Sequence, residues 1–274
     1  MNKTITFKHM ANLGDLIAAL AGIRKICIEE DCKAIIYQQI DVPASYYEGA
    51  DHPTKDASAN MVMMNKRMFD MVKPLTESQF YVSAFELYEG QDVMYDLDII
   101  RGAVHVNMPY GLIQRWISYW YPELQADLCH QWVMNTHHLC PENLQLEYPL
   151  GSTIVLNFTS RYRNPRISYY CLRQFGKKLL FLGTPEEYQT FKDKWGLTEM
   201  RYAQLTDFSE AMYILANCKQ FIGNQSFLYN LAEAMKVPRL LELCTYAPNC
   251  FVMGVNGNEY MHQHALEFYL QTLL

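Results

Sequence analysis

The feature that most constrains this chain is a regular alternation of strand-like and helix-like segments between residues 151 and 243. Short apolar runs typical of buried strands lie at 153–156, 179–182, 220–222 and 240–243. Apolar positions at helical spacing lie between them, at 167–175, 186–195, 208–216 and 227–235. Strands and helices that alternate at these lengths specify a parallel sheet covered by helices on both faces. We therefore expect an α/β domain over residues 149–274, with a final helix over 259–274 that could pack on either domain.

The beginning of the chain predicts a second unit of the same class. Ile5 and Phe7 mark a strand, a helical pattern runs from Leu16 to Cys27, and residues 33–37 form the next strand-like run. A strand–helix–strand unit implies a parallel pair. Beyond it, 61–72 and 112–121 are expected to be helical and 80–87 and 93–100 extended. We expect an N-terminal domain over residues 1–148, with the linker within 142–151.

Composition excludes several classes of function. Half of the 274 residues are hydrophobic, which is enough for a sizeable core, and the net charge of −6 does not suit a general nucleic-acid binder. No apolar leader or membrane-spanning run is apparent, so a cytoplasmic protein is expected. The eight cysteines are dispersed and are expected to be reduced. Cysteine and histidine gather at 129–140, but their spacing matches no standard zinc pattern, so no metal site is expected.

The first candidate site is the loop before the first helix. Gly14 allows a tight turn and Asp15 follows it at the mouth of the helix. Asp15 could simply cap the helix. Alternatively it could act as a base that takes the proton from an acceptor hydroxyl. Because open α/β sheets bind ligands beyond the carboxyl ends of their strands, His9, Asn12 and Gly14 are placed on the acceptor side of the same site.

The second candidate site follows the first strand of the C-terminal half. Arginine forks suit phosphate oxygens, and the free amides of a helix start add further donors. A solvated basic loop is the alternative. The strand–turn–helix segment at Gly183 is explained by capping alone, although Glu186 or Glu187 could accept ribose hydroxyls. The loop residues expected to bind a diphosphate are Thr159, Ser160, Arg161 and Arg163.

The third candidate site is Gly223-Asn224-Gln225-Ser226, where a strand ends in glycine and three polar residues lead into a helix. Polar side chains and free amides at such a turn could hold the phosphates or the sugar of a donor. Simple capping by Asn224 or Ser226 is the competing interpretation.

These segments together resemble the ADP-heptose:lipopolysaccharide heptosyltransferases of glycosyltransferase family 9. Residues 12–20 look like the family's opening Gly-Asp motif, and 223–232 are similar, without gaps, to its Asn-Asp-Ser-Gly-x-x-His-Leu-Ala stretch. The resemblance implies a GT-B fold, in which two Rossmann-like doubly wound domains face a cleft, with Asp15 as catalytic base. It covers the C-terminal half and about the first forty residues. This chain departs from the family at Gln225, Phe227 and Asn230, where the family has aspartate, glycine and histidine.

The leading hypothesis is a glycosyltransferase that moves a sugar from a nucleotide-sugar donor to a hydroxyl of a glycan or another acceptor. It uses no cofactor and no metal, since cationic side chains and helix amides replace the metal. The alternatives are a nucleotide or nucleotide-sugar binding protein without catalysis, and a nucleotide-sugar hydrolase. No nucleic acid and no membrane span are expected among its partners, and a peripheral contact with a membrane is left open.

Overall fold

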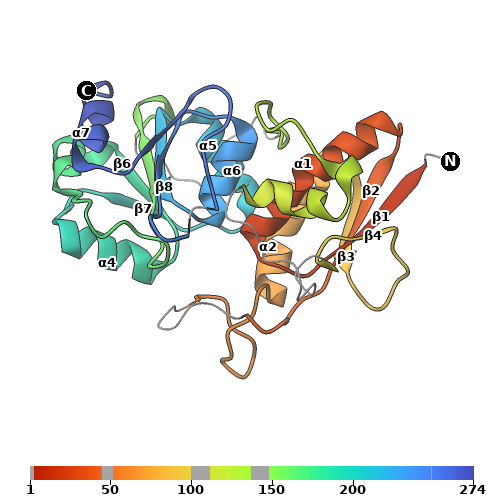
Figure 1. Cartoon of the computed structure of the whole chain (residues 1–274). Helices are drawn as coiled ribbons and strands as arrows, with labels where there is room; N and C mark the ends of the chain where they lie inside the picture. Colours follow the sequence, from red (N-terminus) through yellow and green to blue (C-terminus); the bar gives the residue numbers. More distant parts are fainter. Residues whose placement is uncertain (1–2, 45–51, 100–111, 137–147, 248) are drawn as a thin grey trace. The chain divides into compact units, whose positions relative to one another are not determined.

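The computed structural model describes residues 3–44, 52–99, 112–136, 148–247 and 249–274 (Figure 1). The chain divides into two compact units. Unit 1 comprises residues 1–136 with 207–209, and unit 2 comprises 137–206 with 210–274. Each unit is built on its own sheet, and every strand pair in both sheets is parallel. The α/β class expected from the sequence is therefore confirmed.

Unit 1 has a four-stranded sheet with the order β3-β2-β1-β4. Alternate residues of β1 and β2 are buried, so one face of this sheet packs against the core while the other is only half-covered. The elements of unit 1 are the strands β1 (Thr4–His9), β2 (Lys33–Gln38), β3 (Val82–Leu87) and β4 (Tyr95–Asp96), the helices α1 (Leu13–Glu29) and α2 (Lys66–Glu77), and the 3-10 helices η1 (Ile113–Tyr119) and η2 (Pro122–Leu124).

Helix α1 is the central element of unit 1, and its residues from Leu16 to Ile23 are all buried. A helix that is apolar all round must be covered on every side. Gly22 allows η2 to approach, because a Cβ at this position would lie 2.6 Å from the backbone oxygen of Leu124. The Trp132 indole also donates to the Ile17 carbonyl at 2.8 Å. This packing holds the first turn of α1, which carries Asp15, in a fixed place.

Unit 2 has a six-stranded sheet with the order β10-β9-β8-β5-β6-β7. Its strands β5, β6 and β9 are buried at every residue, as expected for a parallel sheet covered on both faces. The elements are the strands β5 (Ile154–Asn157), β6 (Leu179–Leu182), β7 (Arg201–Ala203), β8 (Gln220–Asn224), β9 (Arg239–Glu242) and β10 (Gly257–Tyr260), the helices α4 (Pro185–Trp195), α5 (Phe208–Asn217), α6 (Phe227–Met235) and α7 (Gln263–Gln271), and the 3-10 helices η3 (Leu150–Ser152) and η4 (Tyr170–Lys178).

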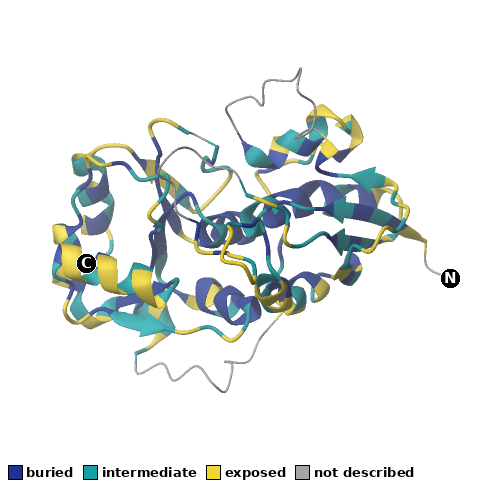
Figure 2. Ribbon diagram, turned by 90° about the horizontal axis from the view of Figure 1, so that it is seen from below, coloured by how far each residue is buried: buried dark blue, intermediate teal, exposed yellow. Residues whose placement is uncertain are grey.

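Aromatic rings dominate one part of the unit 2 core. Phe158 and Phe191 stack with ring centroids 4.6 Å apart, and Tyr169 packs against both. Figure 2 shows buried residues concentrated on the strands and on the helix faces that cover them. Phe158 is the first residue after β5, so the ring cluster anchors the start of the loop that follows this strand.

Several sequence predictions of secondary structure were wrong at the ends or in type. The helix expected over 61–72 begins only at Lys66, because Asn65 caps it by accepting from the Met68 amide at 2.9 Å. The segments 112–121 and 167–175 form the 3-10 helices η1 and η4, and η4 is broken at Gly176 by a positive φ of 47°. The expected final helix over 259–274 overlaps the end of strand β10 and then helix α7.

The extended segment expected over 93–100 contains only the two paired residues of β4 in its described part. Strand β7 was not predicted, because three half-buried residues leave too short a pattern.

Candidate functional site

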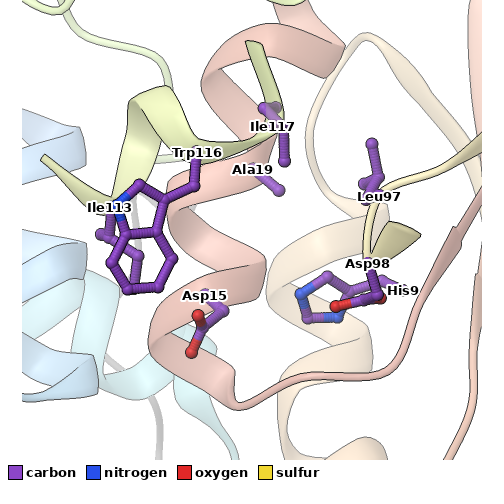
Figure 3. A pocket seen from close by; sticks show the side chains of 8 residues that line it. All are labelled: His9, Asp15, Ala19, Leu97, Asp98, Ile113, Trp116 and Ile117. Carbon is purple, nitrogen blue, oxygen red and sulfur yellow. The ribbon is translucent and has the colours of Figure 1, made fainter. Parts of the chain in front are cut away.

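A small pocket in unit 1 lies beside the first turn of α1, beyond the end of β1. Its cavity volume is about 20 Å³, which is room for about one water-sized group. Figure 3 shows the polar lining, which consists of the carboxyl groups of Asp15 and Asp98 and the ring of His9. The remaining walls are Ala19, Leu97, Ile113, Trp116 and Ile117.

His9 ends strand β1 and is buried. Its Nδ1 lies 2.8 Å from the Oε1 of Gln38, the last residue of the neighbouring strand β2. The Gln38 amide nitrogen donates to the Gln39 carbonyl at 2.9 Å, which leaves its oxygen to accept from histidine. In the neutral ring, Nδ1 of His9 is therefore the nitrogen that donates to Gln38.

Asp15 is the third residue of α1 and is half-buried. The N-cap position belongs to Asn12, whose side chain makes no capping hydrogen bond, so the interpretation of Asp15 as the cap is wrong. Gly14 lies between them in the first turn. The carboxylate of Asp15 lies in the first turn of α1, near the positive end of the helix dipole. The structure thus brings Asp15 and His9 into one pocket, with Asn12 and Gly14 in the adjoining turn.

Asp98 is a pocket residue that sequence reasoning missed. It is buried, and its Oδ2 accepts from the Met10 amide at 2.6 Å. One of its oxygens thus braces the backbone directly after β1. Asp98 lies two residues beyond the end of β4, and a search for polar residues just past each strand could have found it. Trp116 on η1 was also missed, because its segment shows only an amphipathic aromatic pattern.

The candidate site of unit 2 lies at the point where the strand order of its sheet reverses. After β5 the chain continues to β6 and β7 on one side, and β8 returns to the other side of β5. The loops that leave β5 and β8 therefore diverge, and such a switch point is where open α/β sheets bind ligands. Asn157 and Gly223 are register partners at these strand ends. The 159–163 and 224–226 segments predicted from the sequence both start here.

The loop after β5 is tied to the end of β8 by Asn224, which is fully buried. Asn224 accepts from the Thr159 amide at 3.0 Å and donates to the Arg161 carbonyl at 2.6 Å. Ser160 is exposed, and Arg161 is half-buried. The amide of Asn224 is thus engaged in shaping the loop, and Ser160 lies at its exposed part.

Arg163 turns toward the buried Glu242 at the end of β9, although the sequence suggested a phosphate ligand. Its Nε lies 3.1 and 3.2 Å from the two carboxylate oxygens. Its guanidinium also lies over the Phe158 ring, 4.7 Å from the ring centroid. Burial disfavours the charged form of Arg163, but the Glu242 carboxylate outweighs this effect and raises the pKa of the guanidinium.

The turn after β6 is explained largely by helix capping. The Thr184 hydroxyl accepts from the Glu187 amide at 3.2 Å, and Glu187 Oε2 accepts from the Thr184 amide at 3.0 Å. This is a capping box. Burial raises the pKa of Glu187, and hydrogen bonding by Thr184 and the charge of Arg161 offset this only in part. Glu186 is exposed, and Gly183 joins the strand to the box.

The segment after β8 is tightly packed. A Cβ on Gly223 would lie 2.6 Å from the Asn157 carbonyl oxygen, so only glycine lets β8 approach β5 this closely. Gln225 is buried, and its Oε1 accepts from the Asn249 amide at 3.3 Å. Ser226 caps α6 by accepting from the Tyr229 amide at 3.1 Å. Capping by Ser226, which was one interpretation of this segment, is thus present.

Two of the departures from the heptosyltransferase pattern lie on α6. Phe227 is its first residue, and Asn230 is buried one turn later, where its amide donates to the Ser226 carbonyl at 3.1 Å. Gln225, the third departure, replaces an acid by a neutral amide. A neutral amide places no negative charge beside an anionic ligand bound at the helix start.

Within the described ranges, no group of three or more histidine, cysteine, aspartate or glutamate residues is placed to hold a metal ion. His130 lies 2.9 Å from Asp127, while 137–140 of the same cysteine and histidine cluster lie outside the described residues. The cysteines that the structure describes are free thiols. No helix in the described part of the chain is both long enough and apolar enough to cross a membrane.

No model of a protein family matches the sequence, and no curated protein matches it. Solved structures do match over nearly the whole chain. The E. coli heptosyltransferase WaaC with ADP has a TM-score of 0.64 at 9% identity, covering 99% of this chain and 100% of that one. The same enzyme with ADP-2-deoxy-2-fluoro heptose has a TM-score of 0.61 at 9% identity, with the same coverage of both chains.

E. coli ADP-heptose lps heptosyltransferase II has a TM-score of 0.56 at 11% identity, covering 99% of this chain and 98% of that one. These similarities lie at the level of the fold, since the sequences are almost unrelated. They agree with the two parallel sheets described above and with the resemblance of the short motifs. The chain therefore has the GT-B fold, built from two Rossmann-like units, that the heptosyltransferases have.

Proposed function

We propose that this protein is a glycosyltransferase that moves a sugar from a nucleotide-sugar donor to an acceptor hydroxyl. The observation that carries the proposal is the switch point of unit 2, where the polar loop after β5 and the capped start of α6 leave neighbouring strands in opposite directions. In the proposal, the amides at the start of α6 and Arg161 surround one anion at this switch point. The diphosphate of a nucleotide-sugar is the ligand that fits this chemistry.

The donor is held by unit 2 in this proposal. Arg161 contributes positive charge and the Thr159–Ser160 segment contributes hydroxyls, while the first amides of α6 complement the diphosphate charge. Glu186 or Glu187 receives the ribose hydroxyls. The WaaC structures with the same fold contain ADP and an ADP-heptose analogue, which supports a nucleotide-sugar as the ligand class.

Asp15 acts as the general base in the proposed reaction. The acceptor oxygen attacks the anomeric carbon of the donor sugar as the bond to the diphosphate oxygen breaks, and the nucleoside diphosphate leaves with that electron pair. The proton of the acceptor hydroxyl passes to the Asp15 carboxylate. His9 and Asp98 line the same pocket, but both are buried, whereas Asp15 is only half-buried. Asp15 is therefore the better candidate for the base.

Positive charge and oriented amides take the place of a metal ion in this mechanism. The developing charge on the leaving diphosphate is met by Arg161 and by the amides at the start of α6, and fixed donors of this kind stabilise such charge without reorganising.

The test is to incubate the protein with ADP-, GDP-, UDP- and dTDP-sugars, with and without extracts that contain glycan acceptors. We expect one donor to raise the melting temperature and to release free nucleotide faster when acceptor is present. Stabilisation without release would indicate a binding protein. Release that is independent of acceptor would indicate a hydrolase. Either result would contradict the transferase assignment.

A further inference from the structure

The carboxylate of Glu242, at the end of β9, accepts several hydrogen bonds at once. It is fully buried, and all of its hydrogen-bond donors come from the segment that follows β5. Arg163 Nε bonds both oxygens, and the backbone amide of Asn164 and the hydroxyl of Tyr169 complete the set. Tyr169 in turn shares a hydrogen bond of 2.5 Å with Tyr260 of β10. The buried Glu242 carboxylate therefore holds Arg163, Asn164 and Tyr169 of one segment together.

The same loop is fixed a few residues earlier by Asn224, which bonds the amide of Thr159 and the carbonyl of Arg161. Tyr162 lies between the two attachments with a φ of 54°. Residues other than glycine adopt this left-handed conformation only where their surroundings hold them there. The backbone from 159 to 164 is thus held at both ends by buried side chains of β8 and β9.

The charge balance shows why this arrangement depends on Glu242. A buried carboxylate is tolerated when it is paired and hydrogen-bonded, and the guanidinium of Arg163 is its paired charge. Arg163 also lies 5.4 Å from the centroid of the Tyr169 ring, which it covers together with that of Phe158. Arg163 is therefore committed to the interior of unit 2. Arg161, whose charge also acts on Glu187, is then the arginine of 159–163 that the proposed function assigns to the donor.

The geometry points to Glu242 as a positioning residue for the donor diphosphate, and this inference rests on the proposed function. Glu242 does not touch the donor. It acts through Arg163 and Asn164, which hold the 159–164 loop in the conformation that binds the diphosphate. A loop ordered in advance binds more tightly, because less conformational freedom is lost on binding. Glu242 thereby contributes to affinity for phosphate groups and not to affinity for the nucleoside.

The experiment compares ADP with adenosine as probes of the wild-type protein and Glu242→Gln, by calorimetric titration. GDP, UDP and dTDP with their nucleosides replace them if ADP does not bind. Glu242→Gln is expected to weaken diphosphate binding by about tenfold or more and to leave nucleoside binding unchanged. In turnover, the KM for donor should rise while the KM for acceptor stays constant.

Two further variants separate positioning from loss of structure. Glu233→Gln is the matched control, because Glu233 is also buried and paired with an arginine of unit 2, Arg239 at 2.5 Å, but it does not bond the 159–164 loop. It should lower stability without changing the ratio of ADP to adenosine affinity. The double variant Arg163→Met with Glu242→Gln removes both buried charges. It should fold and still bind ADP weakly, even if Glu242→Gln alone does not fold.

Wild-type affinity for ADP in Glu242→Gln or in the double variant would overturn the inference. So would an equal loss of ADP and adenosine binding, since this is what a merely structural role produces. If the wild-type protein binds none of the four nucleoside diphosphates, the proposed function itself is wrong. That outcome is recognisable before any variant is made.

Discussion

Replacing Gly223 by alanine tests whether the close contact of β8 with β5 shapes the switch point. A Cβ at this position would lie 2.6 Å from the Asn157 carbonyl oxygen and 2.9 Å from the Phe221 ring. The ring can shift, but the carbonyl belongs to the central strand. Overpacking of this kind costs about 1–3 kcal/mol. Alanine in a strand gains about 0.5–1 kcal/mol over glycine, so a net loss of about 1–2 kcal/mol is expected.

The assay is thermal and urea denaturation of the variant beside the wild-type protein. The net loss corresponds to a fall in melting temperature of roughly 3–7 °C for a unit of this size. Gly151→Ala is the matched control, because no atom lies within 4 Å of a Cβ built there. It should be neutral or stabilising, by about 0.4–1 kcal/mol at most. If Gly223→Ala were as stable as the control, the contact between β8 and β5 would not be as tight as described.

Three smaller predictions follow from the same structure. Ser226→Ala removes the cap of α6 and should cost about 1 kcal/mol in thermal denaturation, whereas Ser226→Asp should restore most of it; equal stability of all three proteins would refute the cap. Burial raises the pKa of Glu187, so just above pH 4.5 the folded protein holds a proton that the unfolded chain has released. The free energy of unfolding should therefore fall as the pH rises through this range. Glu187→Gln keeps the capping box and should flatten that part of the stability profile, and an unchanged profile would contradict the raised pKa. Nitrogen NMR should find the proton of neutral His9 on Nδ1 and should find a changed tautomer ratio in Gln38→Leu; a proton on Nε2 in the wild-type protein would contradict the Gln38 contact.

The fold could be predicted further than the site. The alternation over 151–243 predicted a parallel sheet correctly because buried parallel strands leave continuous apolar runs, and β6 and α6 were expected with the bounds that they have. Strands β7 and β10 were missed, since half-exposed edge strands carry little apolar signal. The 3-10 helices share the amphipathic pattern of α-helices, so the pattern could not separate the two types.

The candidate site shows a different limit of sequence reasoning. The pattern located the loop ends correctly, because polar residues after buried strands stand out. It could not assign the direction of each side chain. Arg163 and Arg161 look equivalent in sequence, yet one is paired with Glu242, a residue 79 positions away. Asp98 follows the two-residue strand β4, which leaves almost no apolar pattern, and its partner Met10 lies 88 positions away. Such partners are set by strand order, and strand order is not written in local spacing.

The most direct test of the proposed reaction is transfer by Asp15→Asn, measured as release of nucleotide in the presence of donor and acceptor. With Asp15 as the base, the variant should bind the donor as the wild-type protein does, while release falls by about 10²–10⁴-fold. Asp70→Asn, at an exposed acid of α2, should leave both quantities unchanged. Full release by Asp15→Asn with normal donor binding would contradict the account.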